Sequence, residues 1–146
     1  MTTLINTVTT AVLASLTSGT PVCTQIDRVR LRPIAKASAQ AVVVRPAGAD
    51  VLEQALSPGY PVSWVVALAV ECYQRAAVGV ALDVAVDALL EAVYARLMAD
   101  PTLGGVLLAL QPQSVALDFD ADAEQTACAT LVLHARLRGG QSTFTP

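Results

Sequence analysis

VSWVVALAVECYQR, residues 62–75, is the stretch that decides the fold. Its side chains alternate as they do in a β-strand, where successive residues point to opposite faces. One face carries Val62, Trp64, Val66, Leu68, Val70 and Cys72, and the other carries Val65, Ala67, Ala69 and Tyr73. A strand that is apolar on both faces is covered on both. We therefore expect helices over one face of its sheet and a neighbouring subunit over the other.

Two amphipathic helices are predicted, over residues 82–99 and 3–17. Asp100-Pro101 ends the later helix, because proline disfavours a helical conformation in the residue before it, and Gly104-Gly105 frees the turn that follows. The core stripe of this helix is Ala85, Val86, Leu89, Leu90, Val93 and Leu97. The core stripe of the first helix is Leu4, Val8, Val12 and Leu16.

Three further segments alternate with the period of strands, and they are Thr24–Arg32, Gln40–Arg45 and Glu124–Arg138. The segment Pro46–Pro61 holds Pro46, Gly48, Pro58 and Gly59, and it is expected to be a long loop with one helical turn around Val51–Leu56. Val106–Leu117 is apolar but contains Pro112, so a loop and a short strand are expected there.

This order of elements predicts the α+β class, a mainly antiparallel β-sheet with two α-helices packed on one face. Residues 1–138 are expected to form a single domain, and residues 139–146 a flexible C-terminal tail.

The composition favours a structural role. Of 146 residues, 54% are hydrophobic and only 14% are charged, which excludes disorder and suggests that a partner covers some apolar surface. A net charge of −3 argues against general nucleic-acid binding. No apolar stretch is long enough for a transmembrane helix, and no basic residue precedes the apolar N-terminus as a signal peptide requires. Cys23, Cys72 and Cys128 have no metal or redox spacing and are expected to be free thiols.

Few residues point to catalysis. His134 is the only histidine and lies on the polar side of a regular strand, so a surface role is expected. The segment Asp118-Phe119-Asp120-Ala121-Asp122 opens like a calcium loop, but Ala123 and Ala129 occupy the positions where such a loop needs Gly and Glu. We therefore expect no catalytic residue, no metal and no cofactor.

Two rows of like charge are the candidate subunit-interface residues. They are Arg28, Arg30 and Arg32 in one strand and Asp118, Asp120 and Asp122 in an exposed acidic segment. Both rows are most simply read as solvated, since exposed ion pairs are worth about 0–1 kcal/mol each. A sharper hypothesis is that the rows meet across a subunit boundary, where complementary charge fixes register and partner. A third reading places the arginines against DNA in a channel, although three residues do not favour it.

A resemblance rests on residues 88–105, ALLEAVYARLMADPTLGG. A helix that ends in apolar residues and is followed by Asp-Pro-Thr-Leu-Gly-Gly is similar to the tail-terminator proteins of long-tailed phages, the group typified by minor tail protein U of phage lambda. The order of the other predicted elements agrees with that group. The turn residues Asp100, Pro101, Gly104 and Gly105 are carried over as a fold-defining feature only.

The resemblance implies a virion protein at the head-proximal end of the tail, assembled in the host cytoplasm. Such a subunit forms a homo-oligomeric ring, a hexamer in this family, that caps the tail tube, stops its polymerisation and provides the head-docking surface. Its partners would be itself, the tail tube protein and a head-completion or connector protein, with DNA only passing through the channel and no membrane. Two alternatives stay open: another neck or head–tail joining protein, and a small cytosolic enzyme or ligand-binding domain.

Overall fold

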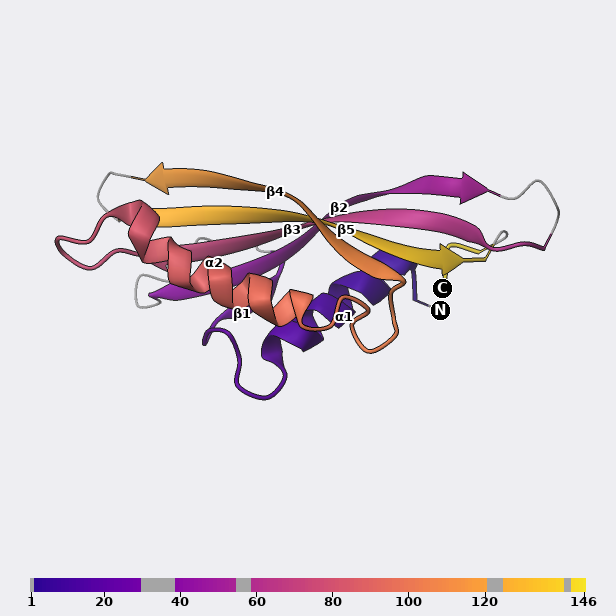
Figure 1. Cartoon of the computed structure of the whole chain (residues 1–146), viewed down its shortest axis with the longest axis horizontal. Helices are drawn as coiled ribbons and strands as arrows, with labels where there is room; N and C mark the ends of the chain where they lie inside the picture. The colour runs from indigo at the N-terminus through magenta and orange to yellow at the C-terminus, as the bar shows by residue number, and fades with distance from the viewer. Residues whose placement is uncertain (1, 30–38, 55–58, 121–124, 141–142) are drawn as a thin grey trace.

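The strand predicted over residues 62–75 is present and lies in the centre of a five-stranded sheet of order β1-β2-β3-β5-β4 (Figure 1). The structure is a computed structural model that describes residues 2–29, 39–54, 59–120, 125–140 and 143–146. The helices are α1 (Leu4–Thr17) and α2 (Leu82–Met98). The strands are β1 (Ile26–Arg28), β2 (Gln40–Gln54), β3 (Val62–Arg75), β4 (Ala109–Asp120) and β5 (Thr126–Gly139).

The predicted α+β class is confirmed. Neighbouring strands are antiparallel except β1 and β2, which are parallel, and both helices lie on the same face of the sheet (Figure 1). We call this face the helix-covered face and the other the helix-free face. α1 contacts β1, β2 and β3, whereas α2 contacts β3 and β5 and reaches β4 only in part.

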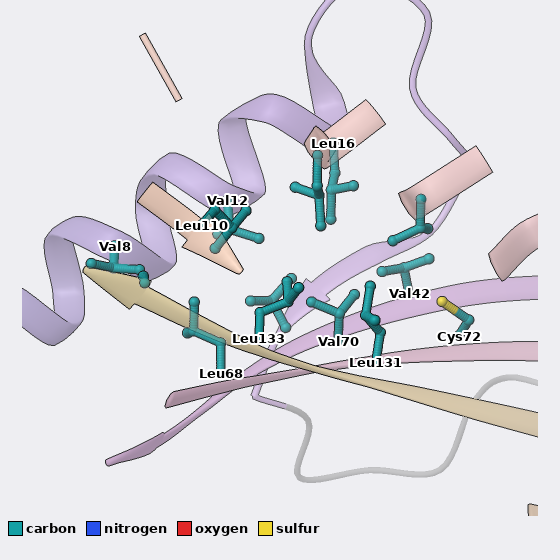
Figure 2. Packing of buried hydrophobic residues seen from close by; sticks show 14 of the residues in the cluster. Val8, Val12, Leu16, Val42, Leu68, Val70, Cys72, Leu110, Leu131 and Leu133 are labelled. Carbon is teal, nitrogen blue, oxygen red and sulfur yellow. The ribbon is translucent and has the colours of Figure 1, made fainter. Parts of the chain in front are cut away.

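The core lies between the helices and the helix-covered face. Figure 2 shows Val8 and Val12 of α1 above Leu68 of β3 and Leu133 of β5, all of them buried. The even-numbered residues of β3 and the odd-numbered residues of β5 point into this layer, as their alternation predicts. Burying each Leu or Val stabilises the fold by about 1.5–3 kcal/mol, so this one layer carries most of the stability.

Two prolines lie inside strands. The loop predicted over Pro46–Pro61 is wrong for residues 46–54, and its residues 55–58 lie outside the described residues. The strand predicted within Val106–Leu117 is present, but it is longer than expected and includes Pro112. β2 continues through Pro46 to Gln54, with register shifts in place of the expected helical turn, and β4 runs for twelve residues through Pro112. The reason is position in the sheet. β1 pairs with β2 only as far as Val44, and β4 is the last strand of the sheet, so among the described strands both prolines lie on an unpaired edge. Proline is tolerated there because no described strand needs its missing N–H.

The ends of two predicted elements differ from the sequence reading. β1 covers Ile26–Arg28 alone and is followed by Val29, whose backbone has a φ of +40°. β5 extends to Gly139, and beyond it Phe144 packs edge to face on Trp64 with ring centroids 5.0 Å apart. The amide of Leu4 donates to the carbonyl oxygen of Phe144 at 3.2 Å. Flexibility of residues 139–146 in solution stays a prediction.

Candidate interaction surfaces

The residues considered for chemistry are spread over the fold. His134 lies half-buried on the helix-free face, between Ala67 of β3 and Gln111 of β4. Within the described ranges, no three His, Cys, Asp or Glu residues gather in a way that could hold a metal ion. Cys72 is buried, which raises the pKa of its thiol to about 12, so at neutral pH it is a protonated core residue. No helix in the described part of the chain is long and apolar enough to cross a membrane.

The two charged rows lie on opposite edges of the sheet. Arg28 is exposed at the end of β1, and Asp118 and Asp120 are exposed on β4. They also point to different faces. Arg28 pairs with Val44 and so lies on the helix-covered face, whereas Asp118 pairs with Cys128 on the helix-free face. The rows therefore do not meet within one subunit. The remaining members, Arg30, Arg32 and Asp122, lie outside the described residues.

The helix-free face carries a polar cluster at its centre that sequence reasoning did not find. Arg45 of β2 and Glu71 of β3 form an ion pair with Nη2 and Oε1 2.8 Å apart, and the Tyr73 hydroxyl donates to Glu71 Oε2 at 2.8 Å. Burial and the neighbouring carboxylate raise the pKa of Tyr73, so it stays a hydrogen-bond donor. Arg45 and Glu71 are 26 positions apart in the sequence, which is why no local pattern signals the ion pair.

Charged residues lie near both ends of the helix-free face. Arg136 and Arg138 of β5 are exposed near the start of β3, while Asp118 and Asp120 of β4 are exposed near its end, where Arg75 of β3 also lies. Half-buried Ala67 and Val132 lie between the two ends. The expectation that β3 is apolar on both faces thus holds for its first half, and Glu71 and Tyr73 make its second half polar on this side.

β4 exposes apolar residues along a free edge. Gln111–Asp120 are all exposed, and Val115, Leu117 and Phe119 are 49%, 52% and 43% exposed. These three residues, which we call the β4 apolar strip, pair with the buried Leu131, Ala129 and Ala127 of β5. They therefore lie on the helix-covered face, beyond the cover that α2 provides. Their alternation is visible in the sequence, but their exposure follows from the position of the helices.

The turn over residues 100–105 is built around one carboxylate. Asp100 Oδ1 accepts hydrogen bonds from the Thr102 amide at 3.1 Å and hydroxyl at 2.7 Å, and Oδ2 accepts from the Gly104 amide at 2.7 Å. These bonds lower the pKa of Asp100. Leu103, Gly104 and Gly105 all have positive φ, which reverses the chain after α2. Pro101 follows Asp100 as the helix stop, and Leu103 and Leu107 then enter the core.

Comparison with known proteins gives matches in structure only. No protein-family model matches the sequence, and no curated protein matches it either. The chain is similar to one from the structure "Virion of native gene transfer agent (GTA) particle", with 16% identity, a TM-score of 0.53, and 90% of this chain and 94% of that chain covered.

A second similar chain comes from the cryo-EM structure of an extracellular contractile injection system, "PVC sheath/tube terminator in extended state". The identity is 13% and the TM-score 0.50, and the match covers all of this chain and 61% of that one. This chain therefore spans about three fifths of the length of that neighbour. At such identities the likeness shows a shared fold alone.

Proposed function

We propose that this chain is a tail-terminator subunit of a phage-like particle. In this role it forms a ring on the end of the tail tube, stops tube polymerisation and provides the surface on which the head docks. The observation that carries the proposal is the fold match along the whole chain to a protein described as a sheath/tube terminator. The other similar chain comes from the virion of a gene transfer agent, which agrees with the proposed location.

The turn over residues 100–105 supports the same proposal on separate grounds. Within the motif that resembles tail terminators, the Asp100 carboxylate accepts hydrogen bonds from the Thr102 hydroxyl and the Gly104 amide. These bonds hold the turn together and explain the residue types of the motif. The turn directs the chain from α2 into Leu107 and on to β4, the edge strand.

The ring is proposed from the placement of charge. Arg28 lies on one edge of the sheet and Asp118 and Asp120 on the other, so copies arranged head to tail bring unlike edges together. Head-to-tail contacts close into rings when the rotation between copies closes. The full rows, with Arg30, Arg32 and Asp122, remain the proposed interface residues, and six copies are the expected ring.

The further partners follow from the role. We propose contacts with the tail tube protein and with a head-completion or connector protein, and passage of the genome through the ring without specific DNA binding. The position is the head-proximal end of the tail. The protein needs no cofactor and is not an enzyme in this proposal.

The second candidate is another neck or head–tail joining protein. This role stays open because the description of the similar virion chain does not give its position in the particle. One experiment separates the two. Particles are produced without this protein and their tails are measured by electron microscopy. A terminator requires tails longer than normal and variable in length, whereas tails of normal, uniform length that fail to join heads would favour the neck role.

A further inference from the structure

β1 and β4 are the two outermost strands of the sheet, and each has one side with which no described strand pairs. Proteins protect such edges with charge, proline or short length, because unpaired backbone groups otherwise recruit another strand. β4 has Pro112 near its start and Asp118 and Asp120 at its end, but residues 113–117 between them carry no charge. The middle of β4 is therefore open to a further strand.

The strand register places the outer edge of β1 level with the middle of β4. Following the paired residues from β1 through β2, β3 and β5 to β4 gives three rows, which join Ile26 to Leu117, Asp27 to Ala116 and Arg28 to Val115. A second copy that is moved sideways across the sheet, without a shift along the strands, therefore brings its β1 beside residues 115–117.

The directions and faces of the two strands agree with such a contact. β1 is parallel to β2, and each of the three steps from β2 to β4 is antiparallel, so β1 and β4 run in opposite directions. The two strands would thus pair in the antiparallel manner that most of the sheet already has. Ile26 and Arg28 lie on the helix-covered face, and so do Val115 and Leu117.

The backbone groups of β1 point outward at the required residues. The amide of Val42 donates a hydrogen bond to the carbonyl oxygen of Gln25 at 2.9 Å, so the backbone of Gln25 faces β2. Backbone groups of successive strand residues point to opposite sides. Those of Ile26 and Arg28 therefore point away from β2, toward the free side.

The backbone groups of β4 point outward at the matching residues. The amide of Leu108 donates to the carbonyl oxygen of Arg136 at 2.8 Å, so the even-numbered residues of β5 bond to β4. Ala116 pairs with an even-numbered residue of β5, and its backbone groups therefore point inward. Those of Val115 and Leu117 alternate with them and point to the free edge.

One register thus satisfies the level, the direction, the face and the backbone bonding together. In it Ile26 meets Leu117 as a hydrogen-bonded pair, and its half-buried side chain lies beside one that is 52% exposed. The methylene stem of Arg28 lies beside Val115, which is 49% exposed. Cross-strand apolar contacts of this kind stabilise a sheet, and here they cover part of the β4 apolar strip.

Charge on the helix-covered side favours a second copy as the occupant. Asp83, Asp87 and Glu91 are exposed and form one row on α2, since residues four apart lie on the same side of a helix. This row lies on the flank opposite Arg96, which bonds to the end of α1, and so it faces the β4 edge. Among the described residues, neither the row nor Arg28 has an ion-pair partner. The pairing brings Arg28 of the second copy to this edge.

The helix-free side adds no direct repulsion in this register. Asp27 faces Ala116, and continuing the register by one residue sets Gln25 opposite Asp118. The side-chain amide of Gln25 donates to Asp27 Oδ2 at 3.1 Å, so a donor lies between the two carboxylates. Like charges are unfavourable when they are directly opposite, and these two are not.

We propose that the outer edge of β1 in one copy pairs antiparallel with residues 115–117 of β4 in the next, so that the sheet continues from subunit to subunit. This inference rests on the ring of the proposed function and names the strands that join its subunits. The contact is heterologous, as a ring requires, because each copy offers β1 to one neighbour and β4 to the other. Backbone pairing supplies affinity, and the side chains set the register.

Disulfide formation between two cysteine variants tests the register. One protein carries Asp27→Cys and the other Ala116→Cys, which would form a non-hydrogen-bonded pair with Cα atoms about 4.5 Å apart, within the reach of a disulfide. Both also carry Cys128→Ser, because Cys23 and Cys72 are buried and Cys128 is only half-buried. Oxidised glutathione is added to the mixture of purified proteins and to particles assembled with both.

A matched control and a second pair make the result specific. Ser114→Cys, exposed on the same face, replaces Ala116→Cys in the control, where the Cα atoms would be about 7–8 Å apart and too distant for a disulfide. If circular dichroism shows that Asp27→Cys does not fold, Arg28→Cys with Val115→Cys tests the same register on the other face, with Cα atoms about 5.5 Å apart.

The expected main product is a disulfide dimer that contains one protein of each kind, and a chain with both cysteines should give a ladder of covalent oligomers. The Ser114→Cys control should give roughly a tenth as much or less. Equal yields with Ser114→Cys would overturn the register. Dimers of Ala116→Cys with itself as the main product, or the absence of mixed dimers from both samples, would overturn the pairing.

Tail length in the same particles separates this inference from the proposed function. Normal tail length without mixed dimers means that the terminator role stands and the strand pairing fails. Mixed dimers with tails whose length does not depend on the protein mean that the strand pairing stands and the terminator role fails.

Discussion

The Arg96 guanidinium, in the last turn of α2, donates a hydrogen bond to the carbonyl oxygen of Ser18 at 2.8 Å, just past the end of α1. It also donates to the carbonyl oxygens of Ser15 and Thr20, at 3.2 and 2.6 Å. The last carbonyl groups of a helix have no partners within it and form the negative end of its dipole. One side chain of α2 therefore satisfies the end of α1 and joins the two helices into the layer that covers the sheet.

Removing this side chain should destabilise the fold. Arg96→Ala leaves the three carbonyl groups to water and is expected to lower the free energy of unfolding by about 1–2 kcal/mol, since bonds to a charged donor exceed ordinary ones and these are partly exposed. Urea unfolding followed by circular dichroism measures the change. Arg138→Ala, on the exposed part of β5, is the control and should change the stability by less than about 0.5 kcal/mol. Equal effects of both would contradict the capping role.

The Asp100 turn predicts a pH dependence. Hydrogen bonds lower the pKa of this carboxyl in the folded state, so its contribution is present above the unfolded pKa and is lost as the pH falls through the folded pKa. Asp100→Ala should therefore be less stable than the natural protein at pH 7, and the difference should shrink in acid. Denaturant unfolding of both proteins at pH 7 and in acid measures this difference. A difference that does not change with pH would show that the carboxylate charge is unimportant.

Gly105 is required for its backbone conformation. Its φ is +85°, and an added Cβ would meet no atom within 4 Å, so the cost of Gly105→Ala is conformational alone. A left-handed residue with a side chain costs roughly 1–2 kcal/mol, which is the expected loss of stability. Gly48 is the matched control, because an added Cβ there also meets nothing and its φ is not positive. If Gly48→Ala is as harmful in thermal unfolding as Gly105→Ala, the turn geometry is not the cause.

The β4 apolar strip should matter for assembly and not for folding. Leu117→Lys is expected to leave the stability of the subunit within about 0.5 kcal/mol, because the side chain is half exposed, and to abolish self-association. Leu131 is buried on β5, diagonally across from Leu117, and Leu131→Ala should instead lower the free energy of unfolding by about 2–5 kcal/mol. Light scattering of the assembled natural protein should give six times 15.1 kDa, or 90.6 kDa, and the lysine variant a monomer. Val84→Lys, exposed on α2, is the control that should still assemble.

Charge across the subunit boundary can be tested by reversal. Asp118→Arg with Asp120→Arg should weaken assembly by making both edges basic, and Arg28→Asp with Arg30→Asp should restore it in part. Ring formation measured at low and high salt provides a second readout, because salt screens exposed pairs and should weaken the natural ring. Failure of the second pair of substitutions to restore assembly would mean that the two rows do not face each other.

Much of the fold could be predicted because it is encoded locally. The alternation in β3 and β5 reports which side chains enter the core, and the spacing of Leu89, Val93 and Leu97 reports the buried side of α2. Asp100-Pro101 ends that helix through restrictions on the backbone of neighbouring residues alone. None of these features depends on what lies across the sheet, so the sequence alone determined the helices, the central strands and the α+β class.

The tertiary structure decided which strands are edges, and this in turn decided where the candidate site lies. Pro46 and Pro112 read as loop residues in the sequence, yet they are compatible with strands because no described strand requires their N–H groups. The exposure of Val115, Leu117 and Phe119 depends on how far α2 reaches, and the separation of Arg28 from Asp118 depends on strand order. Strand order, helix cover and edge position arise from contacts between distant segments, and a local pattern of residue types carries no record of them.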